Sequence, residues 1–168
     1  SKCSKLEEDN LKTGIEEVSK FAFEKCTCLK KINLQRGLLK INKGAFTDCT
    51  SLTEILIPEG LEEIESEAFK GCTNLTNLSL SKDLKNIGEK AFSQCSKLVE
   101  VIIPDGVEEI GDFAFDECSS LKKLTIPLSL TKLREKMFKG IPSSLEISYY
   151  DINIRKNIFS LYEQCSEV

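Results

Sequence analysis

The stretch AFTDCTSLTEILIPEGLEEIESE, Ala45–Glu67, is written several times along the chain with few changes. It returns as AFKGCTNLTNLSLSKDLKNIGEK from Ala68 and as AFSQCSKLVEVIIPDGVEEIGDF from Ala91. One phenylalanine and one cysteine of the unit recur every 23 residues, at Phe23, Phe46, Phe69, Phe92, Phe115 and Phe138, and at Cys3, Cys26, Cys49, Cys72, Cys95 and Cys118. A fixed period of about 20 to 50 residues predicts a solenoid, in which each coil packs only on its neighbours.

Each unit contains one short segment in which apolar and polar residues alternate, such as Ile55 and Ile57 in the quoted stretch. Alternation with β-branched residues predicts one short strand per coil. Proline after the segment, at Pro58, Pro104 and Pro127, predicts the end of the strand. Glycines in the following turn provide a position that tolerates positive φ, at Gly14, Gly37, Gly60 and Gly106.

The remaining parts of the chain predict short helical pieces. The A-F-x-x-C segment reads as one helical turn, whose phenylalanine fills the core of the coil. The apolar residues of the tail follow 3–4 spacing and predict an amphipathic helix, at Ile154, Ile158, Leu161 and Cys165. We therefore expect a solenoid of about seven coils over residues 1–150 and a helical cap over 151–168. Because residue 1 falls inside a repeat, we also expect a fragment or a processed chain that lacks its N-terminal neighbour.

The repeat pattern A-F-x-x-C-x-x-L-x-x-I-x-I-P-x-G-x-x-x-I resembles the BspA-type leucine-rich repeat of bacterial and protozoan surface proteins. The resemblance covers residues 1–150. It implies an α/β, right-handed leucine-rich-repeat solenoid with a parallel sheet on the concave side, displayed at the cell surface for adhesion to host or matrix proteins. The chain departs from the pattern at Ser81, Asp83, Ser129 and Ile141, which affects the geometry of single turns rather than the fold.

The eight cysteines invite a disulfide interpretation because their number is even. Six of them belong to the repeat, so we expect them to stack about 4.8 Å apart with parallel Cβ atoms, whereas a bridge requires about 3.8 Å. This favours buried free thiols that act as small apolar residues, with a disulfide ladder as the weaker alternative. Cys28 and Cys165 lie outside the ladder and are the candidates for a reactive or intermolecular thiol.

Composition argues against several function classes. The chain has no histidine, so the commonest general base and metal ligand is missing. A net charge of −4 without basic clusters gives no nucleic-acid footprint, and no apolar run is long enough to cross a membrane. Adjacent acids such as Glu62 and Glu63 read as a solvated face. We therefore expect no enzyme, catalytic residue, metal or cofactor. Asn74 and Asn77 match the N-glycosylation pattern, which matters only in a secreted eukaryotic protein.

Two sets of equivalent, outward-facing positions on the predicted strands, here called columns, are the candidates for a binding surface. The first alternates in charge, with Glu8, Lys31, Glu54, Asn77, Glu100, Lys123 and Glu146. We interpret it as cross-strand pairing, with a charged binding strip as the alternative. The second contains Asn10, Asn33, Leu56, Ser79, Ile102, Thr125 and Ser148. Leu56 and Ile102 are then exposed apolar residues, which mark a partner surface unless they merely favour the strand conformation.

The sequence thus predicts a non-catalytic protein-binding module, part of a cell-surface adhesin or receptor, whose protein partner docks on the concave sheet. The alternative is an intracellular scaffold or regulatory domain, because unpaired thiols suit a reducing cytosol equally well. The localisation is then the cell surface or secreted, or else the cytoplasm. No nucleic acid and no membrane insertion are expected. The candidate partner-binding residues are Thr53, Glu54, Leu56, Val99, Glu100, Ile102, Lys123 and Thr125.

Overall fold

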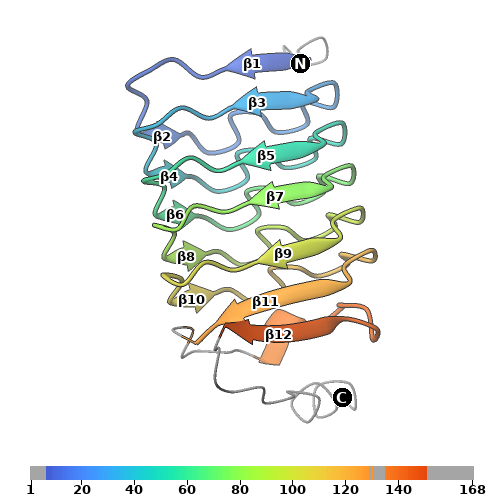
Figure 1. Cartoon of the computed structure of the whole chain (residues 1–168). Coiled ribbons are helices and arrows are strands. Elements are labelled where there is room, and N and C mark those ends of the chain that lie inside the picture. Colours follow the sequence, from blue (N-terminus) through green and yellow to red (C-terminus); the bar gives the residue numbers. More distant parts are fainter. Residues whose placement is uncertain (1–6, 129, 131–134, 151–168) are drawn as a thin grey trace.

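The computed structural model describes residues 7–128, 130 and 135–150, which form a solenoid of stacked coils (Figure 1). One side of the stack, here called the long-strand face, carries strands of three to five residues. These are β1 (Glu8–Asn10), β3 (Lys31–Asn33), β5 (Glu54–Leu56), β7 (Asn77–Ser79), β9 (Glu100–Ile102), β11 (Lys123–Pro127) and β12 (Glu146–Tyr150). The strands pair in parallel with a register offset of one repeat, as Glu54 with Asn77. The parallel-strand solenoid is thereby confirmed.

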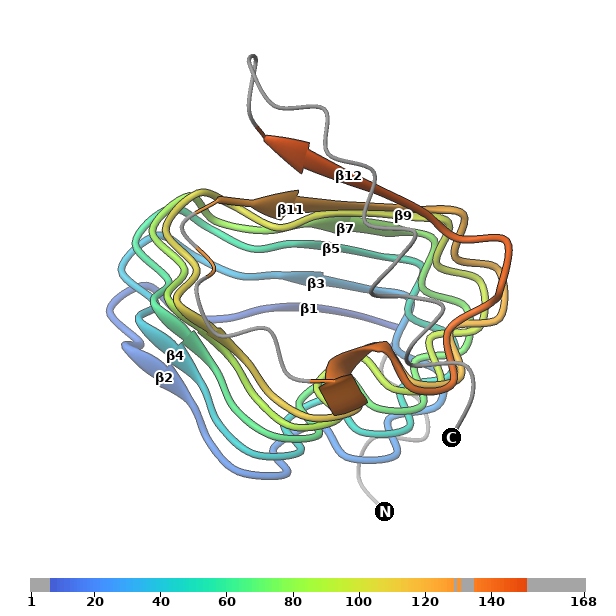
Figure 2. The ribbon, with the colours of Figure 1, turned by 90° about the horizontal axis from the view of Figure 1, so that it is seen from below.

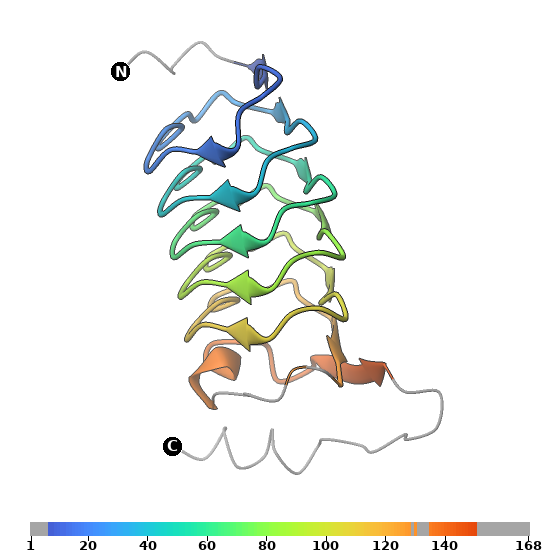
Figure 3. The same cartoon turned by 90° about the vertical axis from the view of Figure 1, so that its left-hand side faces the viewer.

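A second side, the short-strand face, carries strands of two residues, one per coil (Figure 3). These are β2 (Glu17–Val18), β4 (Lys40–Ile41), β6 (Glu63–Ile64), β8 (Asn86–Ile87) and β10 (Glu109–Ile110), and they form one continuous parallel ladder. The expectation of one strand per coil was wrong. Stacking places each extended segment beside its copy in the next coil, so even a pair of residues completes a ladder. Five coils carry both strands, on two sides of the coil (Figure 2).

The core is a set of identical columns that run along the stack. The rings of Phe23, Phe46, Phe69, Phe92 and Phe115 lie 5.1 to 5.6 Å apart between centroids and nearly parallel. Phe46 and the next three rings of this column are completely buried. The ring column adds aromatic contacts to the burial of apolar area, so each coil contributes about the same packing to its neighbour.

The A-F-x-x-C segment is not a helical turn, which corrects the sequence-based expectation. The backbone N–H of Phe46 donates to the carbonyl of Ala68, over 2.7 Å, and that of Asp48 donates to Lys70, over 2.8 Å. Donors directed to the next coil cannot bond to the residue four positions back, as an α-helix requires. The described residues contain a 3₁₀-helix, η1 (Glu135–Phe138), and no α-helix. The predicted cap over 151–168 lies outside the described residues.

The turn after the long strand is built in two ways. Gly60 has φ of +91°, and Gly14 and Gly37 are similar, so the glycine expectation is confirmed there. Gly106 and Asp83 have no positive φ. The carboxylate of Asp83 instead accepts the N–H of Gly60 over 2.9 Å, and its own N–H donates to the hydroxyl of Ser81 over 3.2 Å. The departures at Ser81 and Asp83 are therefore compensated by side-chain hydrogen bonds.

The long-strand face is not one continuous sheet. Its hydrogen-bonded ladders are β1–β3, β5–β7 and β9–β11–β12, with interruptions between β3 and β5 and between β7 and β9. The short-strand face of the same coils is uninterrupted from β2 to β10. The two interruptions divide the face into segments of about two coils.

Candidate functional site

All eight predicted binding residues lie on the long-strand face. Six belong to strands β5, β9 and β11, whereas Thr53 and Val99 directly precede β5 and β9. Strand alternation explains the exposure of the six strand residues, because successive side chains point to opposite faces. Ile55 is fully buried, whereas the next residue, Leu56, is 64% exposed. Ile102 is 47% exposed and Val99 is 44% exposed.

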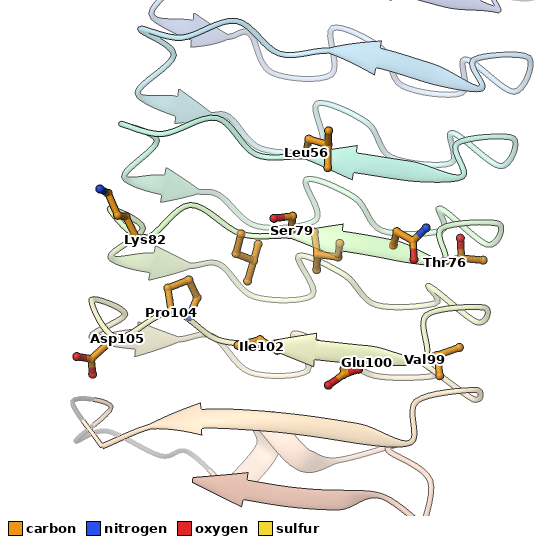
Figure 4. A pocket seen from close by; sticks show the side chains of 12 residues that line it. Leu56, Thr76, Ser79, Lys82, Val99, Glu100, Ile102, Pro104 and Asp105 are labelled. Atoms are coloured by element: carbon orange, nitrogen blue, oxygen red, sulfur yellow. The ribbon is translucent and has the colours of Figure 1, made fainter. Parts of the chain in front are cut away.

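A groove of about 770 Å³ follows the interruption between β7 and β9 (Figure 4). We call it the β7–β9 groove. Four predicted residues line it: Leu56, Val99, Glu100 and Ile102. Leu56, Ser79 and Ile102 lie one below another on three successive strands, and the shorter Ser79 stands in the middle (Figure 4). The structure therefore brings the two exposed apolar residues of the second column into one depression.

A second groove of about 610 Å³ follows the interruption between β3 and β5. Glu54 and Leu56 line it together with Lys31, Asn33 and Arg36 on the polar side. Leu56 borders both grooves and is the most exposed large apolar residue of the described chain. Thr53, Lys123 and Thr125 line neither groove, so the structure does not gather them with the other five.

The candidate list misses the strand at the centre of the β7–β9 groove. Asn77 and Ser79 of β7 line it, as do Leu78 and Leu80. The equivalents of Leu78 in the two neighbouring units, Ile55 and Val101, are core residues, but Leu78 and Leu80 are only half-buried. The signal available in the sequence was Asn77, the one uncharged residue in a column that otherwise carries charged residues.

The charged column of the long-strand face forms ion pairs between coils. Lys31 Nζ lies 3.5 Å from the carboxylate of Glu54, and Lys123 Nζ lies 3.0 Å from that of Glu100. The cross-strand interpretation is confirmed for these two pairs. All four side chains remain about half exposed, so each pair contributes roughly 0 to 1 kcal/mol and its carboxylate stays accessible.

A cluster of three charged side chains with short contacts lies on the short-strand face. Lys40 Nζ contacts Glu65 at 2.7 Å and Glu63 at 3.0 Å. These hydrogen bonds, from Glu65 first and then Glu63, raise the pKa of Lys40 above its usual range. Burial opposes ionisation of Glu65, but the hydrogen bonds from Lys40 and from the Lys43 N–H hold its pKa below the usual value. Both effects keep the ions charged, which stabilises the stack and provides no proton donor or acceptor for catalysis.

Most cysteines of the ladder are buried thiols of low reactivity. Burial raises the pKa of Cys49 and Cys118 to about 12 and that of Cys72 and Cys95 in the same direction. Since the thiolate is the nucleophile, these thiols are unreactive at neutral pH. Cys28, outside the ladder, is a half-buried thiol.

The free-thiol expectation was wrong for Cys26, which is disulfide-bonded. The expectation relied on the distance between stacked coils. However, a disulfide accepts Cα separations of about 4.4 to 6.8 Å, so a coil spacing of about 4.8 Å does not by itself forbid one. The other ladder residues of the described chain, Cys49, Cys72, Cys95 and Cys118, are thiols.

Metal, membrane-spanning and glycosylation sites are the other kinds of site to consider in the described residues. They contain no cluster of histidine, cysteine and carboxylate side chains suited to a metal ion. Within the same residues, no helix has the length and apolar character needed to cross a bilayer. Of the two glycosylation matches, Asn74 uses its amide to donate to the carbonyl of Thr50 and to accept from Lys97, both over 2.6 Å. Asn77 is exposed on β7.

Known proteins share this repeat and this architecture. A family model described as "BspA type Leucine rich repeat region" matches residues 1–99 and 85–168, in 6 copies. The chain is similar to a leucine rich repeat protein of T. pallidum (TpLRR), with 32% sequence identity and a TM-score of 0.81. That similarity covers 86% of this chain and 69% of the T. pallidum protein. No curated protein matches the chain.

Two further solved structures share the fold over shorter parts of their own chains. A leucine-rich repeat protein from Eubacterium ventriosum is 23% identical, with a TM-score of 0.69, over 90% of this chain and 46% of that one. The pneumococcal vaccine antigen PcpA is 26% identical, with a TM-score of 0.58, over 87% of this chain and 31% of that one. The present chain thus spans less than half of either protein.

Proposed function

This chain belongs to the BspA-type leucine-rich repeat family, and from that membership we propose that it is a non-catalytic protein-binding module whose partner docks on the long-strand face. The observation that carries the proposal is the exposure of Leu56 and Ile102, 64% and 47%, on the walls of one groove. Large exposed apolar residues that line a common depression are typical of interaction surfaces. Val99 extends the same apolar surface toward the start of β9.

The solenoid favours association by holding these side chains in place before the partner arrives. Strands β5 and β9 are fixed by the buried residue next to the outward one, Ile55 next to Leu56 and Val101 next to Ile102. Little side-chain and backbone order then has to be created on binding, which lowers the entropic cost of association. Leu56 and Ile102 act as apolar anchors, and Thr53, Glu54, Glu100, Lys123 and Thr125 form the polar rim around them.

We place the module in a cell-surface or secreted protein, as an adhesin or receptor. The similarity to a protein named as a vaccine antigen supports this placement, and so does the disulfide at Cys26, because disulfides persist in oxidising compartments. The second candidate is an intracellular scaffold, favoured by the buried thiols Cys49, Cys72, Cys95 and Cys118. Cell fractionation and labelling of intact cells with a membrane-impermeant reagent distinguish the two locations.

The docking face is tested with the double variant Leu56→Glu and Ile102→Glu. Wild-type protein and variant are passed over a panel of purified matrix proteins on a sensor surface, and each binding signal is compared. Both positions are solvent-exposed, so we expect the fold to persist and the signal to fall by about tenfold or more. Leu39→Glu is the matched control, because Leu39 is 45% exposed and lies next to β4 on the short-strand side. Equal losses in both variants would contradict the proposal.

A further inference from the structure

The charge alternation along the long strands has one exception. From Lys31 the outward column runs through Glu54, Asn77, Glu100, Lys123 and Glu146. Glu54 aligns with Asn77, and Lys123 aligns with both Glu100 and Glu146. A lysine at position 77 would make the column alternate without a break. Asn77 therefore occupies a cation position with a neutral side chain.

The two glutamates beside this position are each paired from one side only by the cations of their own column. Glu54 meets Lys31 from the preceding coil, at 3.5 Å, and Glu100 meets Lys123 from the following coil, at 3.0 Å. Asn77 lies between them, and both it and Glu100 line the β7–β9 groove. The side chains of Glu54 and Glu100 are 41% and 47% exposed, so a cation from outside can reach them.

An apolar depression lies beside the vacant cation position. Ser79 of β7 stands between Leu56 and Ile102 and is the smallest of the three (Figure 4). Asn77 and Ser79 are two residues apart on one strand, so they face the same side at a separation of about 6.6 Å. Leu78 and Leu80, both half-buried, form the apolar floor of the groove. The strand β7 thus offers two adjacent subsites, one anionic at its walls and one apolar.

We infer that β7 and its neighbours receive an extended protein segment that carries a lysine or arginine two positions from an apolar residue. The basic side chain lies over Asn77 between Glu54 and Glu100, and the apolar side chain lies over Ser79 between Leu56 and Ile102. Residues at i and i+2 of an extended chain point the same way and are about 6.6 Å apart, which matches the two subsites. The inference rests on the protein-binding function proposed above and adds the chemistry of the partner.

Charge complementarity argues for this partner over others. The two carboxylates repel an acidic segment or a phosphate backbone, while a basic side chain restores the alternation that the column lacks. The remaining charged residues of the groove, Lys82 and Asp105, have opposite signs. The anionic character of the groove is therefore concentrated at Glu100, beside Asn77.

The short-strand face provides a control within the same coil. Its outward column runs Glu17, Lys40, Glu63, Asn86 and Glu109, so Asn86 also stands where the alternation predicts lysine. No large apolar side chain of the described residues is exposed on β6, β8 or β10. Asn86→Lys thus makes the same change as Asn77→Lys, in the same acidic setting, without an apolar subsite beside it.

The test uses synthetic peptides and amide chemical shifts of the full chain. The probe is a capped threonine peptide with lysine and leucine two positions apart, and its counterparts carry glutamate for lysine or threonine for leucine. At up to about 5 mM peptide, we expect shifts at Leu56, Asn77, Ser79 and Ile102, with affinity reduced about tenfold by either replacement. Asn77→Lys should place a cation between Glu54 and Glu100 and reduce the affinity for the lysine–leucine peptide about tenfold as well. Asn86→Lys should change that affinity by no more than about twofold.

The possible results separate this inference from the proposed function. Equal binding of the glutamate peptide, or full binding to Asn77→Lys, overturns the basic partner while leaving docking on this face intact. Shifts at Asn86 instead of Asn77 overturn the choice of face. No shift with any peptide also overturns the inference, and the proposed function then stands or falls with the matrix-protein panel. A melting temperature of Asn77→Lys at or above that of the wild type shows that lost binding is not lost folding.

Discussion

The thiol of Cys49 donates a hydrogen bond to the carbonyl oxygen of Phe23, over 3.1 Å. The same contact joins Cys72 to Phe46, Cys95 to Phe69 and Cys118 to Phe92, over 3.2 to 3.4 Å. Each thiol thereby ties its own coil to the preceding one, next to the column of stacked rings. The cysteine of the repeat is a donor as well as a small apolar residue, which gives it a role that alanine cannot fill.

Stability should therefore fall in alkali. The pKa of Cys49 is 9.0 in its ordinary state and about 12 when buried in the fold. A raised pKa stabilises the folded protein below pH 9, and this contribution is lost as the pH rises toward 12, because the unfolded chain ionises first. The expected slope is about 1.4 kcal/mol per pH unit for each thiol.

Urea denaturation between pH 8 and pH 11 measures this slope. Lysines titrate at similar pH, so the comparison is between wild type and Cys49→Ala, which differ by one thiol. The variant should be less stable at pH 8 by about 1 kcal/mol, and the difference should shrink or reverse by pH 11. A constant difference over the whole range would show that the buried thiol does not titrate with folding.

The disulfide at Cys26 makes a countable prediction. The chain has eight cysteines, and one disulfide removes two thiols, so six should react with a thiol reagent in denaturant without reductant. Reductant should raise the number to eight. In the native state the buried thiols Cys49, Cys72, Cys95 and Cys118 should be protected. Eight reactive groups without reductant would contradict the disulfide, and four or fewer would indicate further bridges in the ladder.

Gly88 should tolerate no side chain. A Cβ at this position would lie 2.4 Å from the backbone N of Ser66 in the preceding coil, and one at Gly111 would lie 2.4 Å from the backbone N of Glu89. Since backbone cannot move aside as a flexible side chain can, Gly88→Ala should destabilise the protein by roughly 1 to 3 kcal/mol. Gly106→Ala is the comparison, because its Cβ would come no closer than 3.1 Å to the carbonyl oxygen of Lys82. Thermal melting of both variants tests this prediction. An equal loss of stability in the two variants would refute the steric explanation.

At position 25, glycine should give a more stable protein than alanine. It has φ of +58°, a left-handed conformation that costs an L-residue about 1 kcal/mol, and its side chain is exposed. Glycine removes this strain but increases the entropy of the unfolded chain, so Lys25→Gly should be more stable than Lys25→Ala by roughly 0.5 to 1 kcal/mol. Alanine is the matched control, since both variants lose the same ion pair with Glu24. A more stable alanine variant would contradict the prediction.

The repeated sequence pattern alone determined much of the architecture. The period of 23 residues predicted the parallel stack, the alternation of Ile55 and Leu56 predicted which side chain is buried, and Phe46 was correctly placed in the core. These properties depend on local periodicity and on the match between one unit and the next. The same columns also predicted that Lys31 pairs with Glu54 and Lys123 with Glu100.

Tertiary structure alone decided how the backbone donors are used and where the surface is hollow. Whether Phe46 N–H bonds within a helical turn or to Ala68 of the next coil depends on how close the coils approach, which no single unit encodes. The same holds for the extra strand at Lys40–Ile41. The groove arises because β7 and β9 share no ladder, and it brings Asn77 and Ser79 between larger neighbours. Local sequence sets the direction of each side chain, but only the packing of coils sets the space between them.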